Sequence, residues 1–155
     1  MAGCAATIIP DTVKAIGSSA FYNSYNLKSI VLPPAVSRVG EQAFSHCPLL
    51  REVHIPATLT SIGKEAFAAC DNMVKITADP ANPVYDSRNN CNAIIETATD
   101  TLIAGCGTTV IPDTVKEIGQ GAFSSCLSLT DISLPESIVS IGTEAFARCL
   151  YLTDI

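Results

Sequence analysis

The sequence predicts a repeat solenoid, an α/β but β-rich fold in which short coils stack into a superhelix. A phrase of Ile or Val, Gly, two variable residues, Ala and Phe occurs five times. Its glycines are Gly17, Gly40 and Gly63, then Gly119 and Gly142, which gives a period of 23 residues. A fixed period of this size is typical of a stack in which each unit buries its apolar face against its neighbours.

Each coil is expected to contain a strand, because apolar and polar residues alternate over a short stretch. Val53 and Ile55, for example, alternate with polar neighbours, which places both on one face of a strand. Pro56 should end this strand, since proline has no N–H for the ladder. A second short extended piece is expected over residues 36–39. Together the strands of successive coils should form a short parallel sheet.

A short helix is predicted after each glycine of the repeat. Ala43, Phe44, Cys47 and Leu50 have the spacing of one helical face. Glu41 would lie in the first turn, where a negative charge suits the helix N-terminus. Because stacked strands lie roughly 4.8 Å apart, the phenylalanines of successive coils should form a ladder through the core.

One long unit interrupts the period and should be a β-hairpin insertion. Pro56 and Pro112 occupy equivalent positions but lie 56 residues apart, 33 more than one period. We therefore expect one solenoid domain over residues 1–155, with coils at about 10–78 and 112–155 and the long unit at about 79–111. Segments near the N-terminus recur 102 residues later, which indicates a fragment of a longer duplicated array.

The hairpin is predicted from two apolar runs, 92–96 and 101–104, joined by the polar residues 97–100. Pairing Glu96 with Thr101 would place Ile95 beside Leu102. The same register would place Ile94 beside Ile103 and Cys91 beside Cys106.

Buried thiols are the preferred interpretation of the cysteines, because free cysteine behaves as a small hydrophobic residue. One column of the repeat holds Cys47, Cys70, Cys126 and Cys149. Bonds within this column are disfavoured because the side chains should run parallel, whereas a Cys91–Cys106 bond is sterically possible. Zinc is disfavoured because close paired Cys/His spacing is lacking.

Neither a cofactor nor a metal site is predicted. The cluster of Asp86, Asn89, Asn90 and Asn92 could suggest calcium, but it lacks the spaced carboxylates of a calcium loop, and Asn and Asp are ordinary turn residues. His46 and His54 are expected at the surface, and no set of nucleophile, base and orienting group can be assembled. The chain is therefore predicted not to be an enzyme.

Composition argues against two classes of partner. The chain has a net charge of −6, and its nine basic residues are scattered, so a nucleic-acid-binding face is not expected. Apolar runs fall short of the ~20 residues that a membrane helix needs, so membrane insertion is not expected. Both ends lack a polar cap, which predicts self-association through the ends, or fraying, at micromolar concentration.

Binding of a protein is the function class that a solenoid favours, and the outward residues of the strands are the candidates. They differ from coil to coil while the core positions repeat. By alternation, the candidate protein-binding face consists of Ser29, Val31, Glu52, His54, Lys75, Thr77, Asp131 and Ser133. A structural spacer that holds no ligand of its own is the alternative.

The repeat closely resembles the BspA-like leucine-rich repeats of bacterial and protozoan surface proteins. The resemblance rests on Leu-x-x-Ile-x-Leu-Pro followed by Val-x-x-Ile-Gly-x-x-Ala-Phe-x-x-Cys, and on Asn-Pro-Val-Tyr before the hairpin. It implies a right-handed leucine-rich-repeat superhelix and adhesion to host matrix proteins or to other cells. It also implies a cell-surface or secreted location, although Met1 is followed at once by repeat sequence rather than by a signal peptide.

Overall fold

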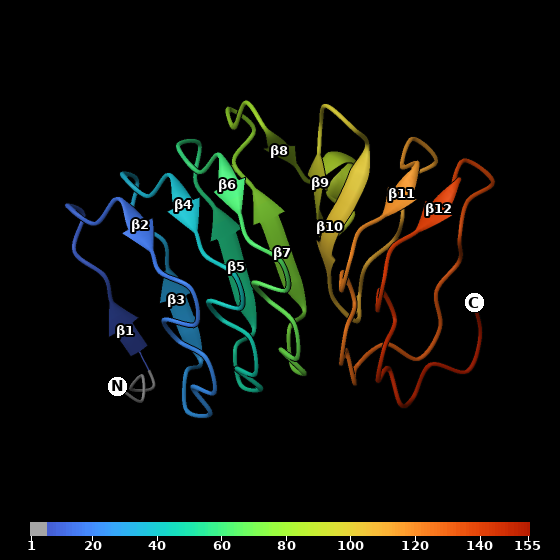
Figure 1. Ribbon diagram of the computed structural model, residues 1–155, viewed down its shortest axis with the longest axis horizontal. Helices are drawn as coiled ribbons and strands as arrows, with labels where there is room; N and C mark the ends of the chain where they lie inside the picture. Colours follow the sequence, from blue (N-terminus) through green and yellow to red (C-terminus); the bar gives the residue numbers. More distant parts are fainter. Residues whose placement is uncertain (1–5) are drawn as a thin grey trace.

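The computed structural model describes residues 6–155, which form a stack of coils running from one end of the molecule to the other (Figure 1). Four strands lie along one side of the first coils: β1 (Ala6–Ile8), β3 (Ser29–Val31), β5 (Glu52–Ile55) and β7 (Lys75–Ala78). β1 pairs with β3 and β5 pairs with β7, both in parallel and with a register of one 23-residue period. The predicted solenoid is therefore confirmed, and we call this side the strand face.

A second row of strands follows the prolines, as the sequence predicted for residues 36–39. It is a parallel sheet of β2 (Ala15–Ile16), β4 (Arg38–Val39) and β6 (Ser61–Ile62). The coils approach one another closely after this row. A Cβ added to Gly63 would lie 2.3 Å from the backbone nitrogen of Glu41 in the preceding coil. Glycine is needed at this point of the repeat because the backbones leave no room for a side chain.

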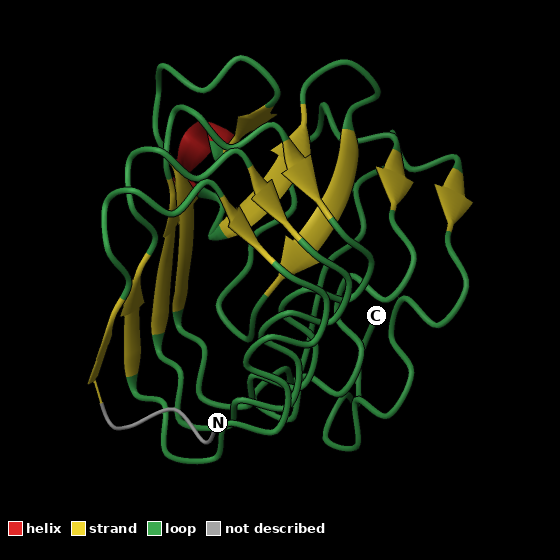
Figure 2. Cartoon of the chain, turned by 60° about the vertical axis from the view of Figure 1, so that its left-hand side comes forward, coloured by secondary structure: helices red, strands yellow, loops and turns green. Residues whose placement is uncertain are grey.

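The helix predicted after each glycine is wrong, because residues 41–50 form consecutive turns instead. Gln42 and His46 have φ angles of 52° and 58°, which no right-handed helix contains. The N–H of Phe44 donates to the carbonyl of Ala66 in the next coil, at 2.8 Å, rather than to its own coil four residues back. The turns thus nest in one another from coil to coil, as Figure 2 shows. They still direct Ala43, Phe44 and Cys47 into the core.

Position 121 tests the cost of these left-handed turns. Gly121 has a φ of 64°, and a Cβ added there would lie 2.7 Å from the Glu65 side chain. Gly121→Ala should therefore lower the free energy of unfolding by about 1–2 kcal/mol. The reverse change at Ala69, which has a φ of 53°, should stay within about 0.5 kcal/mol of the wild type, since relieved strain offsets added chain entropy. Urea unfolding of both variants measures this, and equal effects would contradict the assignment.

The long unit is a hairpin that joins the two blocks of coils. Its elements are β8 (Tyr85–Asp86), the 3₁₀ turn η1 (Arg88–Asn90), β9 (Ala93–Glu96) and β10 (Thr101–Gly105). β10 continues in parallel into β11 (Glu117–Ile118) and then β12 (Ser140–Ile141), which completes a five-stranded sheet in the order β12-β11-β10-β9-β8. β8, β9 and β10 are antiparallel to one another.

The hairpin register agrees with the prediction next to its loop and departs from it further on. Thr101 pairs with Glu96 as predicted. Ile94, however, pairs with Ala104 and not with Ile103, because a bulge at Ile103 shifts the register. Such a bulge adds one residue to one strand and leaves it unpaired.

The hairpin separates two hydrophobic cores and closes both. Ile94 and Ile95 are fully buried neighbours, yet Ile94 packs in the core of the first coils and Ile95 in the core of the last. On the second side the ring of Phe123 lies where a side chain at Gly105 would be, 2.1 Å from an added Cβ. A strand buried on both faces explains why the hairpin sequence is almost continuously apolar.

The predicted phenylalanine ladder is present within each block of coils. Phe21 stacks on Phe44 with ring centroids 5.1 Å apart, and Phe44 stacks on Phe67 at 5.6 Å. Phe123 and Phe146 stack at 5.1 Å beyond the hairpin. The hairpin therefore divides the ladder into a stack of three rings and a stack of two.

Candidate protein-binding face

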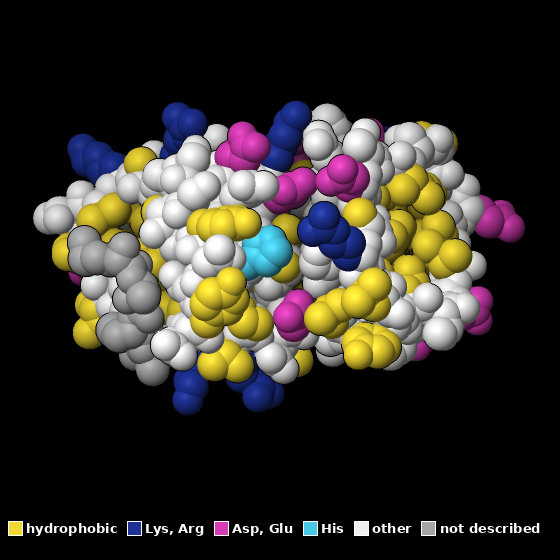
Figure 3. All heavy atoms as spheres, turned by 60° about the horizontal axis from the view of Figure 1, so that its bottom comes forward, with side chains coloured by type: hydrophobic (Ala, Val, Ile, Leu, Met, Phe, Trp, Pro, Cys, Tyr) yellow, Lys and Arg dark blue, Asp and Glu magenta, His cyan; other side chains and the backbone are white. Residues whose placement is uncertain are grey.

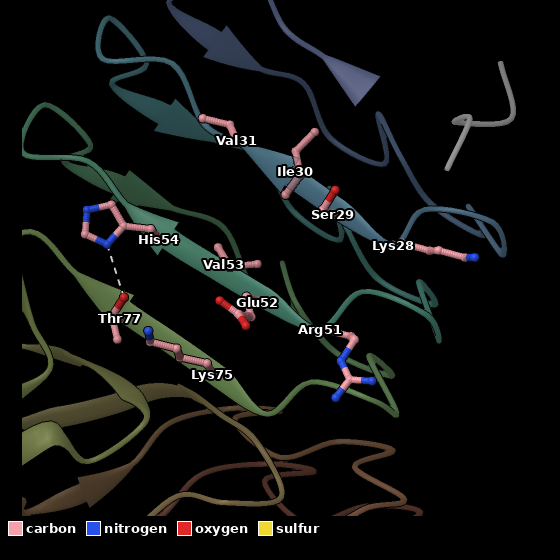
Figure 4. Close-up of a pocket in the computed structure, with 10 residues that line it drawn as sticks. All are labelled: Lys28, Ser29, Ile30, Val31, Arg51, Glu52, Val53, His54, Lys75 and Thr77. Carbon is pink, nitrogen blue, oxygen red and sulfur yellow. Dashed lines mark hydrogen bonds between the residues drawn. The ribbon is translucent and has the colours of Figure 1, made fainter. Parts of the chain in front are cut away.

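The sequence placed eight residues on one binding face, and the structure brings six of them together on β3, β5 and β7. These six are Ser29, Val31, Glu52, His54, Lys75 and Thr77, drawn in Figure 4. They alternate along each strand with the buried residues Ile30, Val53 and Ile76. The alternation rule therefore sorted inward from outward positions correctly.

These strands enclose a shallow hollow of about 520 Å³. Its floor is the backbone of β3, β5 and β7, and the six side chains rise from it (Figure 4). Two further residues, Lys28 and Arg51, complete the lining at the end where the strands begin. Charged side chains of both signs lie among hydrophobic ones over the surface shown in Figure 3.

Side chains of neighbouring strands contact each other across the hollow. The Nδ1 of His54 and the hydroxyl of Thr77 are 3.1 Å apart, so a hydrogen bond joins β5 to β7. Glu52 is the direct neighbour of Lys75 in the same strand pair. Opposite charges at such positions stabilise a sheet by a few tenths of a kcal/mol, on the order of 0.2–1.

Asp131 and Ser133 do not join this group. Both are exposed, but they lie beyond the hairpin, where Asp131 pairs with Asp154 in an isolated parallel bridge. With Asp113 they line a separate hollow of about 390 Å³. The single face expected from the sequence is therefore two hollows of different charge.

Lys28 and Arg51 are the lining residues that sequence reasoning missed. They precede the strands, so a rule based on alternation within strands does not reach them. The signal that could have found them is their spacing, because they are two basic residues one period apart.

An ion cluster, not a metal, organises the Asp86 region for which calcium was considered. Arg88 contacts Asp86 at 2.7 Å and Asp100 at 2.8 Å, and Lys116 contacts Asp100 at 3.0 Å. Its hydrogen bonds to Asp86 raise the pKa of Arg88. The hydrogen bond from Lys116, and then that from Arg88, lowers the pKa of Asp100. The cluster ties the hairpin to the following coil.

The three asparagines of that region serve as turn residues. Asn89, Asn90 and Asn92 have φ angles of 58°, 54° and 51°, a conformation that Asn adopts more readily than most residues. Within residues 6–155, no three His, Cys, Asp or Glu side chains are grouped so that they could hold a metal ion.

The cysteine column consists of free thiols that donate hydrogen bonds between coils. The Sγ of Cys47 donates to the carbonyl of Phe21 at 3.2 Å, and the Sγ of Cys70 donates to that of Phe44 at 3.3 Å. Cys91 and Cys106 are also free, and each donates to a different backbone carbonyl. Cys4 lies outside the described residues. Burial raises the pKa of Cys47 to about 11.

Stability should fall at alkaline pH because of these thiols. Burial raises the pKa of both Cys47 and Cys126 from 9.0 to about 11. The unfolded chain loses these protons first, so their contribution is complete below pH 9.0 and is lost between about 9 and 11. The urea midpoint should fall over this window, and less so in a Cys47→Ala/Cys126→Ala variant. An equal fall in both proteins would contradict burial of the thiols.

The two histidines occupy unrelated places. The His46 ring meets the Tyr22 ring edge-on at 5.2 Å, on the turn side. His54 lies on the strand face with Thr77. Neither contact supplies the chain of nucleophile, base and orienting group that acyl-transfer chemistry requires.

Comparison with known proteins assigns the repeat. The sequence profile of the BspA type leucine rich repeat region matches in six copies, over residues 3–97 and 104–155. A search of curated proteins returned no match. None of the helices within residues 6–155 has the length and apolar character needed to cross a membrane.

Solved structures of bacterial surface proteins share the fold. A leucine rich cell surface protein from Faecalibacterium prausnitzii is 34% identical over 95% of this chain, with a TM-score of 0.80. A leucine-rich repeat protein from Bacteroides ovatus is 32% identical over 86%, with a TM-score of 0.56. The pneumococcal vaccine antigen PcpA is 21% identical over 94%, with a TM-score of 0.81.

The chain spans only part of these proteins, namely 40%, 32% and 38% of their respective lengths. The match of the repeat profile nevertheless extends over nearly all of the sequence. Together with the stacked coils of 23 residues, it identifies the chain as a member of the BspA-type leucine-rich repeat family.

Proposed function

We propose that this chain is a non-enzymatic protein-binding module of a cell-surface adhesin, and that the strand face holds its protein partner. The observation that carries the proposal is the 520 Å³ hollow over β3, β5 and β7. Its rim combines charged, hydrogen-bonding and apolar side chains on a backbone fixed by the stack. Surfaces of this kind are what repeat proteins use for recognition.

The distribution of variable positions supports binding at this face. At one outward position, successive coils carry Ser29, Glu52 and Lys75, which are neutral, acidic and basic in turn. The inward position between the outward ones holds an aliphatic residue in each coil. Val31 is 77% exposed at the rim, so an apolar side chain is available to a partner.

Adhesion is proposed from the company that the fold keeps. The Faecalibacterium relative is described as a cell surface protein, and the chain shares 34% identity with it. A host protein or a surface protein of another cell is the partner that such a location brings within reach. The spacer alternative predicts no saturable ligand at all.

Immobilised chain offered extracellular-matrix proteins and epithelial cells tests the proposal. Saturable binding is expected, and Val31→Asp should weaken it because a charge replaces the exposed apolar side chain. Val139→Asp is the matched control, since Val139 is 81% exposed but lies outside the hollow. Binding that the two changes weaken equally would contradict the assignment to the strand face, and absence of binding would favour the spacer.

A further inference from the structure

The hollow on the strand face has a basic end. Lys28 and Arg51 occupy equivalent positions in successive coils, and the N–H of Arg51 donates to the carbonyl of Lys28 at 3.4 Å. Their backbones are thus one strand spacing apart, about 4.8 Å. Figure 4 shows both side chains at the same end of the hollow, where β3 and β5 begin.

These cations are not neutralised within the part of the chain that the structure describes. All three ion pairs found there belong to the Arg88 cluster, and none involves Lys28, Arg51 or Lys75. Like charges at neighbouring positions of adjacent strands are destabilising. A basic pair that is kept without an acidic partner points to a use outside the fold.

The charge of the hollow is opposite in sign to that of the whole chain. Lys28, Arg51 and Lys75 against Glu52 give a local net charge of +2, whereas the chain carries −6. Charges further away than about 8 Å are largely screened at physiological salt. A ligand in the hollow therefore experiences the local cations more than the acidic remainder.

The opposite end of the hollow is apolar. Val31 is 77% exposed, and its register partner Ile8 in the neighbouring strand is 91% exposed. Val31 follows Lys28 by three residues in the sequence, which is about 10 Å along an extended chain. The hollow thus presents two cations and an aliphatic pair at a separation that one short extended segment can span.

We propose that the hollow binds an extended acidic segment of a partner protein, with carboxylates at Lys28 and Arg51 and an aliphatic side chain on Val31. This rests on the proposed protein-binding function and specifies the partner's chemistry. An exposed aliphatic end favours a polypeptide over a sulfated polysaccharide, which has no aliphatic side chains to place there. The second hollow, with Asp113 and Asp131, should reject the same ligand.

The experiment uses the whole chain and a synthetic peptide in which a pair of glutamates and a leucine stand three residues apart. Fluorescence anisotropy should show saturable binding that weakens as salt is raised. Lys28→Glu/Arg51→Glu should weaken it by roughly tenfold or more, because reversal turns two attractions into repulsions. Val31→Ser should weaken it several-fold, since an exposed methyl contact is lost. Asp113→Lys is the matched charge change outside the hollow and should leave binding unchanged.

Three results would overturn the inference: equal binding of the same peptide with glutamine for glutamate, loss of binding in Asp113→Lys but not in the Lys28/Arg51 variant, or binding of heparin that Val31→Ser does not affect. If the chain binds matrix proteins through Val31 but ignores the acidic peptide, the inference fails and the proposed function stands. If it binds neither, both fail. Circular dichroism of each variant checks that its fold is retained.

Discussion

Phe44→Ala is expected to lower the free energy of unfolding by about 3–5 kcal/mol, the cost typical of an aromatic cavity in a packed core. The Phe44 ring is fully buried and lies between two others, with centroids 5.1 Å from Phe21 and 5.6 Å from Phe67. Removing it deletes both stacking contacts and leaves the coil with no side chain to fill the gap. Urea unfolding monitored by circular dichroism measures the loss.

Phe67→Ala is the informative comparison. Phe67 stacks on one ring only and is 7% exposed beside the hairpin, so the loss there should be smaller. Lys64→Ala serves as the surface control in the same coil. If Phe44→Ala shifts the urea midpoint by no more than Lys64→Ala does, the ladder does not support the fold.

Asn82→Ala should cost about 3 kcal/mol, because it leaves several buried backbone groups without partners. The Asn82 side chain donates to the carbonyls of Pro56 and Leu59, at 2.7 and 2.8 Å. Its oxygen accepts from the N–H groups of Val84 and Tyr85, at 2.9 and 2.8 Å. One side chain thus joins the last regular coil to the start of the long unit. Thermal unfolding followed by calorimetry measures the expected loss.

Asn72→Ala is the matched control, since that exposed side chain makes one hydrogen bond, to the carbonyl of Pro48. It should cost no more than about 1 kcal/mol. Asn82→Asp separates size from chemistry, because the carboxylate keeps the shape but cannot donate to Pro56 and Leu59. If Asn82→Asp is as stable as the wild type, the two donated bonds contribute nothing and the explanation is wrong.

The period predicted the stack, its strands and the inward positions, because all three follow from residues that recur at 23. It could not predict the turns at residues 41–50. One helical face and a run of four-residue turns place apolar side chains at nearly the same intervals, and Gln42 and His46 are not residues that announce a positive φ. The distinction lies in hydrogen bonds such as that from Phe44 to Ala66, which require the neighbouring coil to be present.

The candidate site was predicted in part for a similar reason. Alternation within a strand reveals which residues point outward, so six members of the hollow were found from the sequence. It does not reveal where a stack is interrupted, and the hairpin is what separates Asp131 and Ser133 from the rest. Lys28 and Arg51 contribute through their place beside the strands, which only the three-dimensional arrangement shows.

The long unit was recognised by its length, yet its function in the fold depends on side chains that the sequence did not single out. The hydroxyl of Tyr85 accepts from the N–H of Ile62 at 3.1 Å and so ends the second row of strands. The Ser87 hydroxyl accepts from Ala78 and donates to Ala93, at 2.9 and 2.8 Å. These bonds replace the ladder that a regular coil would have offered.

The two-sided burial of the hairpin has a mechanical consequence. Coils that are held only by their neighbours should peel from the end of an array one at a time when the chain is pulled. Ile94 and Ile95 anchor the hairpin in both cores, and the Arg88 cluster fastens it to the next coil. Peeling should therefore halt at the hairpin until a larger force is reached, which limits how far an array under tension can unravel.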